Sequence, residues 1–262
     1  MSLFGYAFLA ANVSAFVLRF YAGKWLIDQA GHPNFVDFLD WWVAGKFALM
    51  RNAAGAYNYS TFSASQALIV KSTPRNGYYY WIYPPTMLLF FAPIARLPFA
   101  AAFVAWTAAT FSLYAIALYA ISPYLLTIVL ALLPLPVVKN VFDGQTAFLT
   151  AGLLGLSMVF INRRPYLSGI CLGILSCKPQ FLLFFPLVLV ITGQWRVIAG
   201  AITSASLLVG AATLMFGSNA WLSSNIGHLR SGSRRLFKGA PAKPVPPKRR
   251  LCSHPIWAYR GS

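Results

Sequence analysis

The chain has almost no acidic side chains. Its 262 residues include four Asp and no Glu, whereas Lys and Arg together number 21, so the formal net charge is +17. The acidic residues are Asp28, Asp37, Asp40 and Asp143. Of the three His residues, two lie in a C-terminal stretch predicted to be an unstructured tail, which leaves His32. If the protein carries out acid–base chemistry, these few side chains are the candidates for it.

Charged residues of either sign are scarce. They make up 10% of the chain, whereas soluble domains carry about a quarter. Apolar residues make up 58%, and apolar runs of about 20 residues, long enough to cross a bilayer core of about 30 Å, recur along the chain. Alternating segments typical of a membrane barrel are absent. The sequence therefore predicts an all-α, polytopic membrane protein that contacts lipids, and its 13 Tyr and 8 Trp suit membrane interfaces.

Cysteine is also rare, and its spacing excludes the common metal patterns. Cys171 and Cys177 lie in or beside an apolar helix, and Cys252 lies in the tail, so we interpret them as small buried side chains. Without clustered carboxylates, a tightly bound divalent ion is not expected, and we predict no cofactor. The net charge could serve nucleic-acid binding, but no such motif is present. Basic residues that flank spans and meet anionic headgroups explain the charge, and no nucleic-acid partner is predicted.

The chain begins with an apolar run and then a long polar connection. We read residues 3–20 as an uncleaved helix, not a signal peptide, because no positive region precedes them. Residues 21–81 form a connection long enough to carry function. Apolar side chains at helical spacing over 35–50 predict an amphipathic interfacial helix, with Asp37 and Asp40 on one side. Residues 63–66, Ser-Ala-Ser-Gln, have the form of a capping box that starts a second short helix.

The rest of the apolar part alternates helices with short polar breaks. Residues 85–98 are too few for a full span and predict a re-entrant or interfacial segment. Predicted spans and shorter apolar helices follow at 99–121, 124–138, 146–161, 166–177, 181–191 and 197–216. Residues 139–145 are predicted as a polar loop. Arg163, Arg164 and Arg196 lie in short loops, and the positive-inside rule places those loops in the cytoplasm. Asp37, Asp143 and Lys178 then lie together on the opposite side, although the long first loop is itself basic.

Three of these residues have alternative interpretations. Lys178 lies amid apolar sequence at a helix broken by Pro179, so it is either a seat for a phosphate or a side chain that snorkels to headgroups. Asp37 is either a general base, a solvated residue on an amphipathic helix, or a residue paired with Lys46 or Arg51. Asp143 could hold a sugar hydroxyl, a base's proton or a cation, or be a loop residue paired with Lys139.

Several short motifs occur in order along residues 1–217. They are Asp37-Phe38, Trp42-Val43-Ala44-Gly45, Ala56-Tyr57-Asn58, Tyr83-Pro84-Pro85, Gly144-Gln145 leading into Phe148-Leu149-Thr150-Ala151, and Lys178-Pro179-Gln180. Together these motifs resemble glycosyltransferase family 87, whose members use polyprenol-phosphate sugars and have the GT-C membrane fold. The resemblance implies a GT-C-like helical bundle with a non-cytoplasmic active site beneath the interfacial helices of the first loop.

The resemblance also implies a reaction and a set of residues. The reaction is the inverting transfer of a hexose, typically mannose, from a polyprenyl-phosphate sugar to a lipid or glycan acceptor. Asp37 matches the family's catalytic base, and Lys178 with Arg75 is expected to stabilise the leaving phosphate. The other predicted substrate-binding residues are Asp40, Tyr83, Asp143, Gln145 and Gln180. The implied location is a bacterial inner or plasma membrane, with the active site facing the periplasm or outside.

The chain departs from the family pattern in two places. Asn58 stands where members often have a second Asp, and after residue 216 the family continues through further spans. Here residues 218–262 are predicted to be a disordered tail, with eight basic and no acidic residues over 230–250. We therefore expect a transferase domain over 1–217 that lacks part of the bundle, which allows a second interpretation as an inactive remnant. A third is a membrane transporter, in which Lys178 and Asp143 line a substrate path.

Overall fold

The structure is a computed structural model that describes residues 7–225, apart from 8, 9, 12, 13, 16, 20, 23, 24, 35, 72–77, 125, 128–130, 132, 133, 179 and 180. Within these residues the regular structure is helical, and the one extended feature is an isolated antiparallel bridge between Ile27 and Pro33. The all-α prediction is confirmed. Arg75, Gln180 and the tail from 226 onward lie outside the described residues.

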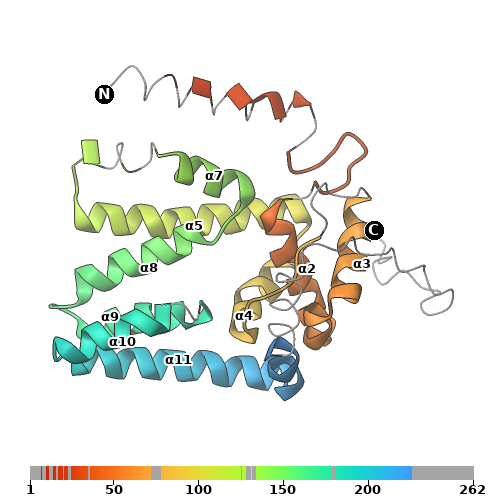
Figure 1. The fold of residues 1–262 in the computed structure, drawn as a ribbon. Helices are drawn as coiled ribbons and strands as arrows, with labels where there is room; N and C mark the ends of the chain where they lie inside the picture. Colours follow the sequence, from red (N-terminus) through yellow and green to blue (C-terminus); the bar gives the residue numbers. More distant parts are fainter. Residues whose placement is uncertain are drawn as a thin grey trace, which may run out of the picture.

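Five helices run side by side as a layer (Figure 1). They are α5 (Phe99–Ile121), α8 (Ala147–Phe160), α9 (Pro165–Ile174), α10 (Phe181–Ile191) and α11 (Trp195–Phe216). In the described part of the chain, α5 and α11 are long and apolar enough to cross a membrane. Their outer faces expose large apolar side chains, such as Ile116 on α5 and Leu207 on α11. The segment η2 (Leu175–Cys177) ends α9, so the predicted break before residue 181 is confirmed.

Small residues allow α9 and α11 to pack closely. A Cβ atom on Gly169 would lie 2.1 Å from the carbonyl oxygen of Val197, and one on Gly173 would lie 1.8 Å from Oγ of Ser204. Across this contact Gly200 approaches Tyr166, where a Cβ would lie 2.5 Å from the backbone oxygen. Close backbone approach through small residues is the usual way for apolar helices to associate in lipid.

A second group of helices lies at one end of this layer (Figure 1). It contains α2 (Asp37–Leu49), η1 (Ala53–Tyr57), α3 (Tyr59–Val70) and α4 (Pro85–Ile94). The short α4 confirms the prediction that residues 85–98 do not form a full-length span. Helix α3 begins at Tyr59, because the Asn58 side chain accepts a hydrogen bond from the backbone N–H of Ser60. The predicted start at the capping box of residues 63–66 is wrong, since those residues lie inside the helix.

Helix α2 forms at the predicted place, but it is not an amphipathic surface helix. Its buried residues are Phe38, Leu39, Trp41, Val43, Ala44, Gly45, Phe47 and Ala48, which surround the helix axis. The burial arises because α2 packs against α4, α3, η1 and the start of α5. Gly45 permits the approach of α4, since a Cβ there would lie 2.4 Å from the carbonyl oxygen of Phe91. Helix α2 is therefore the core of this group.

Helix α7 (Leu135–Asp143) replaces the polar loop predicted for residues 139–145. It starts after Pro134, whose ring fixes φ and suits a helix start, and it ends at Gly144 in the left-handed conformation, with φ 65°. The proline thus begins a new helix within the predicted 124–138 span, and Lys139 and Asn140 are helical. At the other boundary, residues 218–225 are also helical, although the tail was expected to begin at 218.

The layer has two chemically different ends (Figure 1). Arg163 and Arg164 lie in the turn between α8 and α9, and Arg196 lies at the start of α11, all at one end. The opposite end carries the α2–α4 group, the turn between α7 and α8, and the end of η2 at Lys178. The elements predicted to come together from distant parts of the sequence are therefore at the same end of the fold.

Candidate active site

Asp37 is the first residue of α2. It is half-buried, and its Oδ2 accepts a hydrogen bond from the side-chain amide of Gln145. Its place in the first helical turn also favours a negative charge, because the helix N-terminus carries partial positive charge. The sequence predicted both residues as site candidates, and the structure joins them directly.

A glycine brings Gln145 to Asp37. Gly144 has φ 65°, in the region that side-chain-bearing residues rarely adopt. A Cβ atom at this position would lie 2.7 Å from Cβ of Phe38 and 2.8 Å from Cε2 of Phe103. The turn between α7 and α8 therefore sits directly on α2 and α5, and no other residue would allow both the conformation and this approach.

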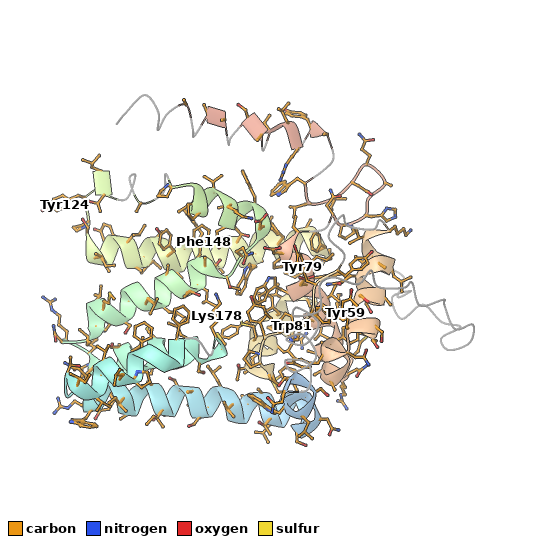
Figure 2. All side chains as sticks on the ribbon, viewed as in Figure 1. Tyr59, Tyr79, Trp81, Tyr124, Phe148 and Lys178 are labelled. Atoms are coloured by element: carbon orange, nitrogen blue, oxygen red, sulfur yellow. The ribbon has the colours of Figure 1, made fainter. Side chains whose placement is uncertain are left out.

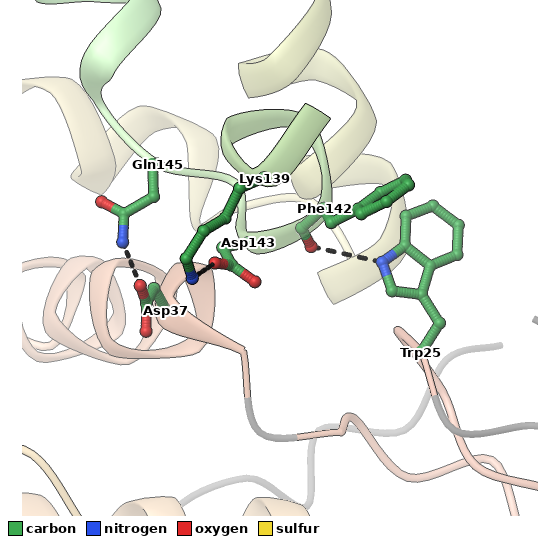
Figure 3. Close-up of polar contacts among 6 residues, drawn as sticks. All are labelled: Trp25, Asp37, Lys139, Phe142, Asp143 and Gln145. Carbon is green, nitrogen blue, oxygen red and sulfur yellow. Dashed lines mark hydrogen bonds and ion pairs between the residues drawn. The ribbon is translucent and has the colours of Figure 1, made fainter. Parts of the chain in front are cut away.

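Asn140 fixes the same turn from within. Its buried side chain accepts a hydrogen bond from the backbone N–H of Ala147 at 3.0 Å, and its carbonyl oxygen accepts one from the N–H of Gln145 at 3.1 Å. On the outer side, Nε1 of Trp25 donates to the carbonyl oxygen of Phe142 at 3.2 Å (Figure 3). The backbone around Gln145 is thus held from several directions, which defines where its side chain points.

Two further charges lie beside Asp37 (Figure 3). Lys139 and Asp143 form an ion pair at 2.5 Å, in which the lysine side chain is 68% exposed and the aspartate 23% exposed. Burial raises the pKa of Asp37 above its ordinary value, and the negative charge of Asp143 adds to this rise. The charge of Lys139 and the hydrogen bond from Gln145 lower that pKa. The ion pair confirms the pairing with Lys139 that one of the two interpretations of Asp143 predicted. Asp143 also affects Asp37 through its negative charge.

Asp40 faces helix α3. Its Oδ1 accepts a hydrogen bond from Nε2 of Gln66, a side chain with no exposed surface. Burial raises the pKa of Asp40 well above its ordinary value, and the nearby charge of Asp37 adds to the effect. The two carboxyls predicted on one side of the helix thus have separate partners, Gln145 and Gln66.

Tyr83 adds a neutral hydroxyl group near the two carboxyls. Its ring packs on Trp41 with centroids 4.2 Å apart, and its backbone oxygen accepts a hydrogen bond from the Tyr57 hydroxyl at 3.0 Å. Burial, and to a lesser degree the charges of Asp37 and Asp40, raises the pKa of Tyr83 to about 12. The hydroxyl therefore stays protonated and can donate a hydrogen bond at neutral pH.

Lys178 lies at the break that follows η2 (Figure 2). It is half-buried, and its Nζ donates to Oγ1 of Thr150 on α8 at 3.1 Å. In the described part of the chain, ion pairs join only Lys139 to Asp143 and His32 to Asp28. Lys178 therefore has no carboxylate partner there. An ammonium group has three N–H donors, so a hydroxyl leaves much of its capacity unused.

The predicted candidates meet at one end of the fold in two linked groups. Asp37, Gln145, Asp143, Asp40 and Tyr83 lie around the start of α2. Lys178 contacts Thr150 on α8, the helix that follows the turn containing Gln145. Sequence reasoning did not predict Gln66, Asn140 or Thr150 as residues of the site. A charged Asp or Lys is costly to bury without a hydrogen-bonding partner. The apolar sequence around these charged residues therefore indicated that they have partners, without indicating which residues those are.

Two other features bear on the assignment. A cavity of about 330 Å³ is lined by Arg51, Ala53, Leu214, Met215 and Phe216. None of the candidate residues lines it, so it does not mark this site. Among the described residues, no group of three or more His, Cys, Asp and Glu side chains could hold a metal ion.

Comparison with known proteins gives one match. The model of glycosyltransferase family 87 matches residues 81–234, which is more than half of the 262-residue chain. The matched range contains Tyr83, Asp143, Gln145 and Lys178, whereas Asp37 and Asp40 precede it. No curated protein and no solved structure matches the chain.

Proposed function

The chain belongs to glycosyltransferase family 87, and on that premise we propose that it transfers a hexose, specifically mannose, from a polyprenyl-phosphate carrier to a hydroxyl of a lipid or glycan acceptor. Membership makes it a glycosyltransferase of a membrane-associated family. The donor, the sugar and the roles of individual residues are our proposal.

One observation carries the proposal. The same end of the fold holds a half-buried carboxylate, Asp37, and a half-buried ammonium group, Lys178, that do not neutralise each other or pair with any other described charge. Transfer from a lipid phosphate needs a base for the acceptor and a cation for the leaving group. Two unneutralised charges of opposite sign, on separate elements at the same end, match these two needs.

In the proposed reaction, Asp37 accepts the proton of the acceptor hydroxyl as its oxygen attacks the anomeric carbon from the face opposite the phosphate. The bond between this carbon and the phosphate oxygen breaks, and its electron pair leaves with the polyprenyl phosphate. The configuration of the sugar is therefore inverted. The hydrogen bond from Gln145 orients the carboxylate, and the Tyr83 hydroxyl is available to a sugar oxygen.

Lys178 is proposed to stabilise the leaving group. The donor is a phosphodiester with one negative charge, and the product phosphate monoester gains a second, so a fixed cation binds the product side more strongly. Thr150 holds Nζ in place through its hydroxyl. Arg75 and Gln180, predicted to assist, stay proposals because they lie outside the described residues. Placing Arg163, Arg164 and Arg196 in the cytoplasm puts this site on the periplasmic or outer side.

The test is transfer in membranes from cells that express the 262-residue chain. Tritiated polyprenyl-phosphate mannose is supplied, with the corresponding glucose donor alongside and with membranes lacking the chain as a control. We expect label in a lipid or glycan fraction, release of polyprenyl phosphate in equal amount, and an inverted linkage identified with linkage-specific glycosidases. Label that arrives equally well from a nucleotide sugar, with carrier charging blocked, would contradict the proposed donor.

A further inference from the structure

The side chains of Asp40 and Gln66 form an incompletely satisfied buried contact. Nε2 of Gln66 donates to Oδ1 of Asp40, but the other atom of the amide, Oε1, is buried and has no hydrogen-bond partner among the described residues. The Gln66 side chain has no exposed surface, so this oxygen is not in contact with bulk water. A buried polar atom without a partner costs about 1–3 kcal/mol.

The protonation state of Asp40 decides whether this oxygen is satisfied. A carboxylate can only accept hydrogen bonds, so an ionised Asp40 leaves Oε1 of Gln66 without a donor. A carboxylic acid has one O–H donor. The acid and the amide can then meet edge to edge in a cyclic pair, in which each group donates once and accepts once.

The charges around Asp40 favour the acid form. Asp37 lies one turn earlier on the same helix, and Tyr83, in the segment before α4, is close enough to both carboxyls for their charges to raise its pKa. Gln66 faces Asp40 from α3. No described cation forms an ion pair with Asp40, since the two ion pairs in the described residues involve Asp28 and Asp143. An ionised Asp40 would place two negative charges close together in a partly desolvated site.

We propose that Asp40 is kept as a neutral carboxylic acid by a two-bonded pair with Gln66, so that Asp37 is the one ionised carboxyl of this helix face. Burial and the charge of Asp37, which raise the pKa of Asp40, act in the same direction, whereas the hydrogen bond that Gln66 donates to the carboxylate lowers this pKa. The second bond, from the acid O–H to Oε1 of Gln66, forms only when Asp40 is neutral. Asp40 is then a positioning residue, and not the substrate ligand that the sequence suggested. Because Asp40 is neutral, it adds no second negative charge beside Asp37. This role of Asp40 in catalysis rests on the proposed function.

Infrared spectroscopy tests the protonation state without any activity. The chain has only four side-chain carboxyls, so a carboxylic-acid C=O band can be assigned by substitution. The full chain in detergent at pH 7 is expected to show such a band, which disappears in Asp40→Asn and persists in Asp28→Asn. In Gln66→Leu the band should move to higher wavenumber, because the acid C=O loses the hydrogen bond from the amide. Absence of a band that depends on Asp40 would overturn the proposal.

Thermal unfolding gives a second readout with a definite sign. Above about pH 4, an Asp that is protonated in the folded chain loses its proton on unfolding. Such an Asp therefore lowers the free energy of unfolding, and this loss of stability becomes larger as the pH rises. Asp40→Asn keeps an N–H donor for Oε1 and removes this cost, so its melting temperature should exceed the wild-type value at pH 7, with the difference shrinking toward pH 4.

Asp28→Asn is the matched control for the unfolding experiment. Asp28 accepts hydrogen bonds from the backbone N–H groups of Ala30 and His32, and the His32 bond is the main cause that lowers the pKa of Asp28. Its stabilising effect is therefore present at pH 7 and is lost on acidification, so Asp28→Asn should melt at a lower temperature than wild type at pH 7. If Asp40→Asn behaves in the same way as this control, Asp40 is ionised and the proposal is wrong.

The pH dependence of transfer tests the positioning role separately. With Asp40 already neutral, Asp40→Asn should leave the acid limb of kcat/KM unchanged. An acid limb that moves to lower pH in Asp40→Asn would show that a negative charge had been removed from beside Asp37, which contradicts the proposal. If wild type gives no transfer, the proposed function fails, while the infrared and unfolding results still decide the state of Asp40.

Discussion

Gln145, at the turn between α7 and α8, donates a hydrogen bond to the carboxylate of Asp37, which lies 108 residues earlier in the chain. This contact joins the first loop to the layer of long helices. It depends on the left-handed Gly144 and on the close approach of that turn to Phe38. Gln145, which lies inside the range matched by the family model, thus positions the proposed base. Asp37 itself lies before that range.

Removing the Gln145 amide should reduce the ionised fraction of Asp37 and loosen its orientation. A hydrogen bond to the charged form lowers the pKa of Asp37, so Gln145→Leu should raise that pKa and move the acid limb of kcat/KM to higher pH. Loss of a hydrogen bond to a charged group costs about 1.5–3 kcal/mol, which predicts a fall in kcat/KM of at least about tenfold near neutral pH. Gln194→Leu, in the turn before α11 at the other end, is the control and should transfer at the wild-type rate.

Lys139 and Asp143 should shift the same acid limb in opposite directions. Lys139→Met removes a positive charge that lowers the pKa of Asp37, so the limb should move to higher pH. Asp143→Asn removes a negative charge that raises the pKa, so the limb should move to lower pH. Because the pair is partly exposed, each shift should be at most about one pH unit. Shifts in the same direction would show that these residues do not act on Asp37 through charge.

Gly144 should tolerate no side chain. Gly193 has nearly the same φ, 67° against 65° for Gly144, but a Cβ atom on Gly193 meets nothing within 4 Å. Gly193→Ala should therefore cost only the left-handed conformation, about 1–2 kcal/mol. Gly144→Ala adds the collision with Phe38 and Phe103, and should lower the melting temperature further and reduce transfer. Equal losses of stability would show that the turn can move away from α2.

The sequence predicted helix positions well where hydrophobic runs and breakers coincide. Residues 99–121, bounded by Pro98 and by Ser122, match α5, and the break at Lys178 follows from Pro179. Orientation and burial were harder to predict. The spacing of apolar residues around Trp42 predicted a helix with one apolar face. In the structure α4 packs against α2 at Gly45, so α2 is buried on several sides. This burial follows from tertiary packing and not from the spacing. Likewise Pro134 begins α7 where the pattern indicated a continuing span.

For the site, the sequence indicated which residue types matter but not their partners. A rare Asp or a Lys in apolar sequence is costly, so Asp37, Asp143 and Lys178 could be selected in advance. Their contacts with Gln145, Lys139 and Thr150 join residues that lie between 4 and 108 positions apart in the chain. Gln66 was assigned to a helix cap because Ser-x-x-Gln fits that pattern, and its contact with Asp40 became visible only once α3 was placed against α2.

Lys178 should be needed for binding the lipid phosphate, whatever the rate of transfer. Lys178→Met should reduce photolabelling by a photoreactive polyprenyl-phosphate analogue about tenfold or more, since a charge-assisted contact contributes roughly 1.5–3 kcal/mol. Arg196→Met removes an exposed cation at the opposite end of the layer and should leave labelling unchanged. Equal reductions in both variants would indicate general attraction of the lipid to a basic protein and not a phosphate site at Lys178.

The most direct test of the central claim compares two Asp→Asn variants in the first loop. Transfer of tritiated mannose from polyprenyl-phosphate mannose is measured in membranes that express equal amounts of wild type, Asp37→Asn and Asp28→Asn. Asp37 is predicted to be the base, so Asp37→Asn should lose transfer by about a hundredfold or more, whereas Asp28→Asn should retain it. Equal transfer by all three chains, or loss in Asp28→Asn alone, would contradict the assignment of Asp37.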